Sequence, residues 1–383
     1  MPKVPIGKNV FTTSIERLTK LFKDESYRPI VAFSGGKDST VTLELSLIVA
    51  KKLNKLPLEV HLIDEEIVFP GTYEYAEQVA NRSEIDFHWI VNNQPNNNLF
   101  NREMPYWWTF DPKVSEDVWV RKPPKFFKKI TVPTMSCVDD ISFPPPDNGA
   151  TINVIGMRAE ESRTRTMAMF SMSKNEDHFI TFEKSKQFLW EDGSPRLGRA
   201  YPIYDWKDRD IWLAIKEFNW KYSNSYNQMY RGGWPAKECR TGPIMHNYGS
   251  IKKLGWAMRT WPDWFDKVST RLPGIRTLAK FGNKAVMPVR KLGETWEQCY
   301  HRVNITDAPQ WIAERAEEAK ERFLHAHAGH SVHPFPDVSM CARCNDVGSW
   351  RKATLSMYMG DLNGDSGLPP VPPSFFRDDL ASW

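Results

Sequence analysis

Hydrophobic and polar residues follow two alternating patterns along the first half of the chain. Short apolar runs bounded by turn residues predict buried strands, and apolar residues spaced three and four positions apart predict helices that pack on them. The runs typical of strands are residues 29–33, 58–66, 86–92 and 151–157. The stretches typical of helices are residues 14–24, with Ser14 as the expected cap, 39–53 and 71–84. This order of strands and helices predicts an α/β fold with a parallel sheet.

The rest of the chain differs in pattern and divides the sequence into parts. Tryptophan and proline are frequent in an insertion at 93–148, whereas helical and aromatic patterns follow residue 205, clearest at 208–218 and 309–328. We therefore expect four parts. They are an N-terminal helix at 1–25, an α/β domain at 26–235 that carries the insertion, a mainly helical and basic extension at 236–360, and a proline-rich tail at 361–383.

Composition restricts the class of protein. With 383 residues, 41% hydrophobic and 26% charged, the chain is typical of a globular protein of one large or two fused domains. No run of eighteen apolar residues exists and the N-terminus lacks a signal-peptide core, so we expect no membrane span and a cytoplasmic protein. Five cysteines, an odd number in a long chain, argue against a disulfide scaffold.

The stretch VAFSGGKDST, residues 31–40, predicts a phosphate-binding loop. It places two glycines and a lysine between a strand and a helix. Glycines let the backbone approach an anion, and a helix N-terminus offers N–H groups and the positive end of its dipole. The spacing differs from the Walker motif. A plain strand-to-helix turn with a capping serine is the alternative, but such a turn does not require Lys37 and Asp38 after two glycines.

Several motifs in order resemble one known family. SGGKDS at 34–39 resembles the PP-loop of the adenine nucleotide alpha hydrolase superfamily, and within it the chain resembles the phosphoadenosine phosphosulfate (PAPS) reductase family. IDEEIVFP at 63–70, GMRAEESRTR at 156–165 and YPIYDWKDRDIW at 201–212 are similar to further elements of that family. The resemblance covers roughly residues 25–230 and implies a Rossmann-like parallel sheet.

The resemblance also implies a set of site residues. The nucleotide would be held by Ser34, Gly35, Gly36, Lys37, Asp38, Ser39, Asp64, Gly156, Arg158 and Arg165. Lys37 and Asp38 are also catalytic candidates. Asp64 ends a strand beside the loop, where a carboxylate can meet a ribose hydroxyl or a metal such as Mg²⁺. Arginine forks suit phosphate or sulfate oxygens, which fits Arg158 and Arg165.

The chain departs from PAPS reductases at their cysteine element. That family has Glu-Cys-Gly-x-His, whereas residues 237–242 read KECRTG, so only Glu238 and Cys239 fit. Cys239 is flanked by Lys237 and Arg240, which favour the thiolate, and it is the third catalytic candidate. The longer chain resembles a branch of the family on phages and plasmids that includes the immunoglobulin-binding regulator A type. That branch implies a ParB-like protein as partner.

The extension carries two further candidate sites. Cys341 and Cys344 form a single C-x-x-C, which would bind Zn²⁺ or an iron–sulfur cluster with two other ligands; two ordinary cysteines near a turn, or a redox pair, are the alternatives. Residues 240–291 hold eleven Lys or Arg against two Asp, a charge of +9, so the rest of the chain, whose total is +4, sums to −5. Tryptophans interleave with these cations, which is typical either of nucleic-acid binding or of amphipathic helices in water.

Three functions are compatible with these patterns. The first is an enzyme that acts at the α-phosphate of ATP, with pyrophosphate release and transfer of an adenylyl group or of sulfur to an acceptor. The second is a reductase of PAPS or adenosine phosphosulfate, in which Cys239 attacks sulfur. The third, from another class, is a nucleotide-sensing regulator that binds DNA or a ParB-like protein.

Overall fold

The computed structural model describes residues 8–93, 95–98, 100–131, 135–161, 179–242, 252–282, 287–339 and 348–377. The chain divides into two compact units, one of residues 1–94 and 109–246 and one of residues 95–108 and 247–383. This division differs from the sequence prediction, which ended the α/β domain at 235 and kept all of 93–148 within it. Residues 95–108 belong to the second unit because Tyr106 and Trp108 pack there against Leu362 and Val371.

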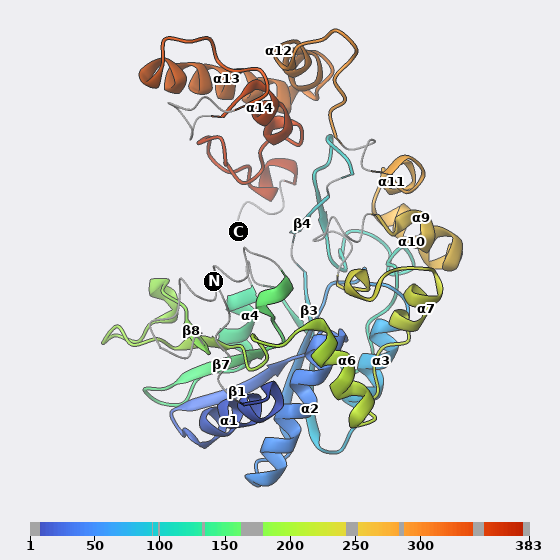
Figure 1. The fold of residues 1–383 in the computed structure, drawn as a ribbon, viewed down its shortest axis with the longest axis vertical. Coiled ribbons are helices and arrows are strands. Elements are labelled where there is room, and N and C mark those ends of the chain that lie inside the picture. The colour runs from blue at the N-terminus through green and yellow to red at the C-terminus, as the bar shows by residue number, and fades with distance from the viewer. Residues whose placement is uncertain are drawn as a thin grey trace. The chain divides into compact units, whose positions relative to one another are not determined.

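The first unit is built on a sheet of seven strands in the order β6-β3-β2-β1-β7-β9-β8. Figure 1 labels β1, β3, β7 and β8 of this sheet. All neighbours are parallel except β8 and β9, which are antiparallel. The α/β fold predicted from the sequence is thus confirmed. The strands are β1 Tyr27–Ala32, β2 Leu58–Asp64, β3 Ile85–Asn92, β6 Lys128–Ile130, β7 Ala150–Ile155, β8 Ile180–Phe182 and β9 Leu197–Ala200.

Helices cover both faces of this sheet. Successive residues of a strand point to opposite faces, so each strand contributes side chains to both helix layers. Val31 belongs to the main core cluster, with residues of α1, α2, α3 and α6, whereas the neighbouring Ile30 packs with Val138 and Phe143 at α4. The helices of this unit are α1 Val10–Lys23, α2 Lys37–Lys52, α3 Thr72–Ala80, α4 Met135–Ser142, α6 Asp208–Glu217 and α7 Ser225–Arg231.

The order of the strands creates a switch point between β1 and β7. From β1 the chain adds β2, β3 and β6 on one side, and β7 then returns to pair with the other side of β1. Ligands of open α/β sheets bind outside the carboxyl ends of strands at such a point. Residues 33–36 follow β1 and residues 156–158 follow β7, so the sequence places both candidate motifs at this position.

One predicted helix end is wrong. Ser14 was expected to cap the first helix, but α1 begins at Val10, where the side chain of Asn9 accepts the N–H of Thr12 at 2.8 Å. Ser14 is buried instead, and its hydroxyl lies 2.8 Å from the carbonyl oxygen of Pro202. Apolar periodicity alone did not reveal the first turn, because the helix starts with residues that are only partly buried.

The second unit is mainly helical, as predicted for the extension. It contains a hairpin of β4 Pro95–Asn97 and β5 Tyr106–Trp108, and the helices α9 Leu254–Thr260, α10 Pro262–Arg271, α11 Ile275–Phe281, α12 Trp296–Tyr300, α13 Gln310–His330 and α14 Trp350–Met357. Buried Tyr300 joins α12 to α13 by donating to the carbonyl oxygen of Ala316 at 2.6 Å. None of the helices in the described ranges is long and apolar enough to span a membrane.

Candidate functional site

The loop between β1 and α2 is held in shape by its own side chains. The backbone N–H of Ser34 donates to the hydroxyl of Ser39 at 3.2 Å, and that hydroxyl donates to the carbonyl oxygen of Gly36 at 2.9 Å. Gly35 has a φ of +72°, and a Cβ there would lie 2.8 Å from the Cγ2 of Thr72. The tight turn therefore requires glycine, and α2 begins directly after it at Lys37.

Two cations, Lys37 and Arg158, meet the carboxylates of Asp38, Asp208 and Glu160 near the start of α2. The ammonium of Lys37 lies 3.1 Å from Asp38 and 3.1 Å from Asp208, and both cations of the site, Lys37 and Arg158, are nearly fully buried. Arg158 lies 2.5 Å from Asp38 through Nε and 3.3 Å from Asp208 through a terminal nitrogen. The structure thus brings together Lys37, Asp38 and Arg158 as predicted candidates and adds Asp208 from the N-terminus of α6.

Lys37 keeps its charge despite its burial. Burial lowers its pKa, but the charges of Asp38, Tyr226 and Asp208 together outweigh that effect, so the pKa lies above the ordinary value of 10.5. The backbone N–H of Lys37 donates to the hydroxyl of Tyr226 at 2.8 Å, and its ammonium lies 5.9 Å from the centre of that ring. A positive charge therefore sits at the positive end of the α2 dipole, which suits an anion.

Gly156 places the end of β7 against the first turn of α2. A Cβ at Gly156 would lie 2.7 Å from the carbonyl oxygen of Asp38 and 2.9 Å from the backbone nitrogen of Ser39. A larger residue would separate these backbones, so glycine is needed for the close approach. This contact lets Arg158, two residues further on, reach Asp38.

Asp64 lies at the end of β2, as the sequence indicates, but its carboxylate is fully engaged with protein groups. One oxygen accepts the backbone N–H of Glu66 at 2.9 Å, and the other accepts the indole N–H of Trp89 at 2.8 Å and pairs with Arg121. The side chain is completely buried. This geometry favours a structural ion pair over contact with a ribose or a metal.

Cys239 is buried close to a residue that contacts the loop. Its sulfur lies 3.5 Å from the carbonyl oxygen of Pro235, and Thr241, two positions later, lies 3.3 Å from the hydroxyl of Tyr226. Because Tyr226 accepts the N–H of Lys37, the segment of Cys239 is connected to the PP-loop through one tyrosine.

Other predicted residues cannot be placed. Arg165, Cys341 and Cys344 lie outside the described residues, so their roles stay predictions. In the described ranges, one group of His and acidic residues lies close enough to hold a metal ion, namely Glu59, Asp86 and His88. Arg28 already pairs with Glu59 at 2.5 Å, so this group is accounted for by ion pairing.

Three residues of the site did not emerge from the sequence. Asp208 lies inside the 201–212 motif, but only the fold brings it within 3.1 Å of Lys37. Tyr226 and Thr241 carry no motif, and their contacts with the loop depend on the tertiary fold alone.

Part of the chain matches a known family model. Residues 28–116 match the family model of the phosphoadenosine phosphosulfate reductase domain. The chain is 25% identical to the uncharacterized protein YbdN of Escherichia coli K12, over 94% of this chain and 90% of that protein. It is 30% identical to adenosine 5′-phosphosulfate reductase of Neisseria meningitidis serogroup B, over 24% of this chain and 28% of that enzyme.

Solved structures give weaker similarity. FMN adenylyltransferase of Candida glabrata, solved in complex with ATP, aligns with a TM-score of 0.36 and 16% identity, over 61% of this chain and 60% of that one. Phosphoadenylyl-sulfate reductase of Candida auris aligns with a TM-score of 0.29 and 14% identity, over 61% of this chain and 95% of that one. The chain thus spans less than two thirds of the adenylyltransferase.

Proposed function

We propose that this protein is a PP-loop enzyme that binds an adenine nucleotide and acts at the α-phosphate of ATP. The observation that carries the proposal is the pair of buried cations, Lys37 and Arg158, at the glycine-rich start of α2. The matched reductase domain over 28–116 contains this loop and supports the nucleotide class.

The carboxylates around these cations occupy the position that phosphates would take. Asp38 and Asp208 now neutralise Lys37 and Arg158, and both acids are more exposed than the cations. Incoming phosphate oxygens would replace them as partners, since charge-assisted bonds to phosphate are at least as strong as those to carboxylate. Once freed, the carboxylate of Asp38 is an oxygen donor of the type that Mg²⁺ accepts, together with nucleotide phosphates.

The chemical step is transfer of the adenylyl group. An oxygen or nitrogen of the acceptor forms a bond to the α-phosphorus, and the bond from that phosphorus to the bridging oxygen breaks. Pyrophosphate leaves with the electron pair, and the proton of the nucleophile passes to solvent. Lys37 and Arg158 would stabilise the charge that grows on the phosphate oxygens, and bound Mg²⁺ would neutralise the leaving pyrophosphate.

Calorimetric titration tests the proposal. We expect ATP·Mg to bind the native protein and Lys37→Ala to weaken binding by about a hundredfold, because a buried charge–phosphate bond is lost. Lys51→Ala, an exposed lysine in the last turn of the same helix, is the matched control and should bind normally. Absence of ATP binding by the native protein, or equal binding by both variants, would contradict the proposal.

The position of Cys239 favours a second candidate, reduction of PAPS or adenosine phosphosulfate. In that reaction the thiolate forms a bond to the sulfonate sulfur, the bond from sulfur to the phosphate oxygen breaks, and the nucleotide leaves. A second thiol then attacks the sulfur of Cys239, a disulfide forms and sulfite leaves, so the two thiols supply the two electrons. Tighter binding of PAPS than of ATP·Mg, with turnover lost in Cys239→Ser, would favour this reaction over adenylyl transfer.

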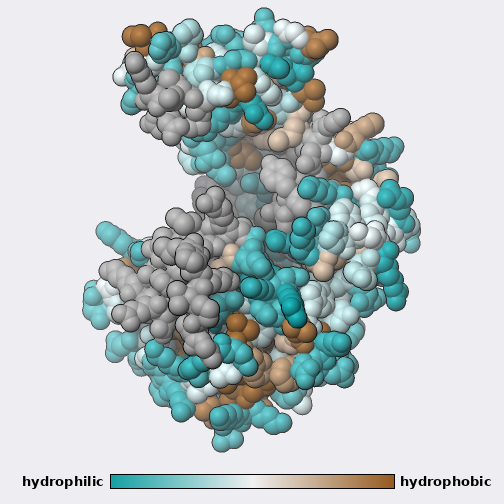
Figure 2. All heavy atoms as spheres, in the orientation of Figure 1, coloured by the Kyte–Doolittle hydropathy of each residue, from teal (hydrophilic) through white to brown (hydrophobic). Residues whose placement is uncertain are grey.

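The basic helices of the second unit favour a regulatory alternative. In the described part of 240–291, seven Lys or Arg are exposed against the exposed acids Asp263 and Asp266, whereas Lys253 and Arg271 are buried. Figure 2 shows mainly hydrophilic residues over α9 and α10 on the viewed face. Such a surface suits a polyanion. Salt-sensitive DNA binding that persists in Lys37→Ala would support a nucleotide-sensing DNA-binding protein, with a ParB-like protein as the other partner to test.

A further inference from the structure

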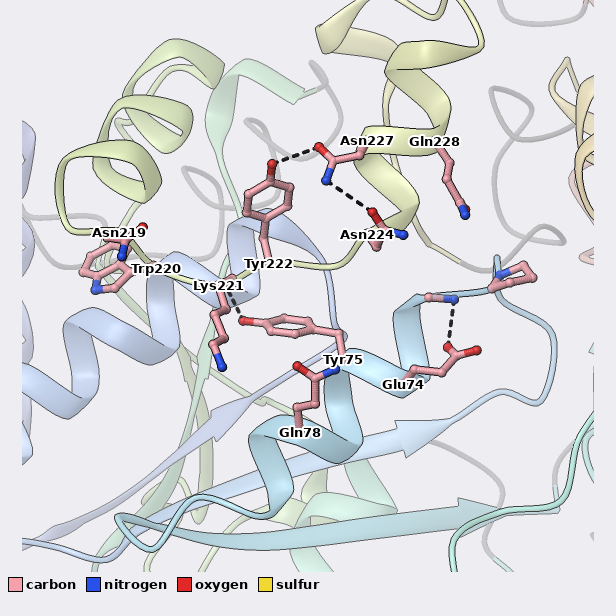
Figure 3. Close-up of a pocket in the computed structure, with 12 residues that line it drawn as sticks. Glu74, Tyr75, Gln78, Asn219, Trp220, Lys221, Tyr222, Asn224, Asn227 and Gln228 are labelled. Carbon is pink, nitrogen blue, oxygen red and sulfur yellow. Dashed lines mark hydrogen bonds between the residues drawn. The ribbon is translucent and has the colours of Figure 1, made fainter.

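Two hollows lie next to each other in the first unit. The larger, about 810 Å³, is lined by α3, by residues 219–222 and by α7 (Figure 3). The smaller, about 220 Å³, is lined by residues of α6 and α7 and by Ala236 and Cys239. Tyr222 and Asn227 line both hollows, and the hydroxyl of Tyr222 donates to the amide oxygen of Asn227 at 2.9 Å. This bond forms the partition between them.

The larger hollow is nearly uncharged, and its wall mixes aromatic side chains with carboxamides. Its walls carry five carboxamides, those of Gln78, Asn219, Asn224, Asn227 and Gln228. The carboxylate of Glu74 is used to accept the N–H of Gly71 at 2.8 Å, and Lys221 adds one exposed cation. The amide oxygen of Gln228 is buried and has no hydrogen-bond partner in the described part of the chain. Asn227 already donates to the amide oxygen of Asn224 at 3.3 Å. The other carboxamides can both donate and accept, so they complement another amide.

The smaller hollow is aromatic. Four of its seven lining side chains are Trp212, Tyr222, Tyr226 and Tyr230. The ring of Trp212 lies edge-on to those of Tyr222 and Tyr226, with centres 5.4 Å apart in both pairs. The indole N–H of Trp212 is buried, and no acceptor for it lies among the described residues. The hollow therefore suits an apolar group that carries one hydrogen-bond acceptor.

Both hollows are connected to the PP-loop. Tyr226, in the wall of the smaller one, accepts the backbone N–H of Lys37. At the larger one, the hydroxyl of Ser223 donates to the carbonyl oxygen of Gly71 at 2.9 Å, and the next residue, Thr72, packs against Gly35. A molecule bound in the hollows would thus lie beside the loop that holds the phosphates.

We propose that the two hollows bind the acceptor substrate and that this acceptor is peptide-like. Its uncharged amides would pair with the carboxamides of the larger hollow, and an aromatic or aliphatic side chain would enter the smaller one, with a carbonyl near Trp212. One exposed lysine is too little charge for a nucleic-acid backbone, and the carboxamides suit a ligand with polar groups better than a lipid chain. The inference rests on the proposed function only in assigning this ligand the role of acceptor.

Calorimetry with two capped tripeptides tests the inference. Acetyl-Gly-Phe-Gly-amide should bind the full-length protein about tenfold tighter than acetyl-Gly-Ala-Gly-amide, because the phenyl ring fills the aromatic hollow. Gln228→Leu should weaken both peptides, whereas Trp212→Phe, which keeps an aromatic ring and removes the N–H, should weaken the Phe peptide most. Gln310→Leu in α13 is the matched control and should change neither.

Each outcome decides a separate point. No binding of either peptide, binding unchanged by Gln228→Leu, or preference for a single-stranded oligothymidylate would overturn the peptide acceptor. Titration of ATP·Mg into the same samples separates this from the proposed function. Peptide binding without ATP binding would remove the adenylylation proposal and leave the peptide site, and ATP binding without peptide binding would do the reverse.

Discussion

The ion pairs after β1 and β7 differ from the ion pair after β2 in which partner is buried. After β1 and β7 the cations Lys37 and Arg158 are 3% and 4% exposed at the side chain, and the carboxylates of Asp38 and Asp208 are 15% and 25% exposed. At the end of β2 the carboxylate of Asp64 is fully buried, and its partner Arg121 is 22% exposed. After β1 and β7 solvent reaches the acids, whereas after β2 it reaches the cation.

This difference separates a binding site from a structural contact. Partly exposed acids can leave buried cations and be replaced by another anion, so the β1–β7 end can accept phosphates. Asp64 cannot leave Arg121, Trp89 and the N–H of Glu66 without exposing several buried polar groups. An acid at the end of a strand is therefore a weak guide to ligand binding, and the burial of its partners decides its role.

The largest expected effect comes from removing the buried acid. Asp64→Ala leaves Trp89 and Arg121 without their acceptor, and breaking a buried ion pair costs about 3–5 kcal/mol. We expect the free energy of unfolding to fall by about that amount in thermal or urea denaturation. Asp117→Ala, at an exposed surface aspartate, should change it by less than about 0.5 kcal/mol. A loss below about 1 kcal/mol for Asp64→Ala would remove the distinction between the two strand ends.

A smaller effect is expected where the two backbones meet at the binding end. Gly156→Ala inserts a methyl group 2.7 Å from the carbonyl oxygen of Asp38, and such overpacking costs about 1–3 kcal/mol. We also expect ATP affinity to fall by about tenfold, because the first turn of α2 must shift. Gly329→Ala in α13 meets no atom within 4 Å and should be neutral or stabilising. Normal stability and affinity in Gly156→Ala would show that the contact does not shape the site.

The sequence predicted the loop better than it predicted the partners of the loop. Residues 34–39 lie together because they are consecutive, and Gly156 and Arg158 follow the strand that pairs with β1. Asp64 was placed correctly on β2. Its carboxylate is engaged by Arg121, which comes from the insertion 57 residues later. Long-range pairing of this kind leaves no local pattern. The short strands β6 and β9, of three and four residues, carry too few positions for alternation to show.

A third prediction concerns Asp208, which pairs with both cations of the site. Asp208→Asn removes one carboxylate that competes with phosphate for Lys37 and Arg158, so ATP affinity should rise by about threefold, equivalent to about 0.7 kcal/mol. Calorimetric titration measures the change, and Glu217→Gln at the other end of α6 is the control. Lower affinity in Asp208→Asn would instead mean that this carboxylate contributes to the bound complex, for example as a ligand of the Mg²⁺ that accompanies ATP.

The smallest effect is expected from pH, because Asp38 and Asp208 raise the pKa of Lys37. Burial alone would lower the pKa of Lys37 and weaken anion binding in mildly alkaline solution, but Asp38, Tyr226 and Asp208 hold the pKa above 10.5. A cation with a raised pKa is fully charged below its ordinary value, and its contribution is lost only as pH rises through the raised one. ATP affinity should therefore stay constant between about pH 8 and pH 10, where the triphosphate and Lys37 both keep their charges. Titration across this range checks the expectation. A steady fall in affinity would show that burial dominates at Lys37 and that the exposed acids do not sustain its charge.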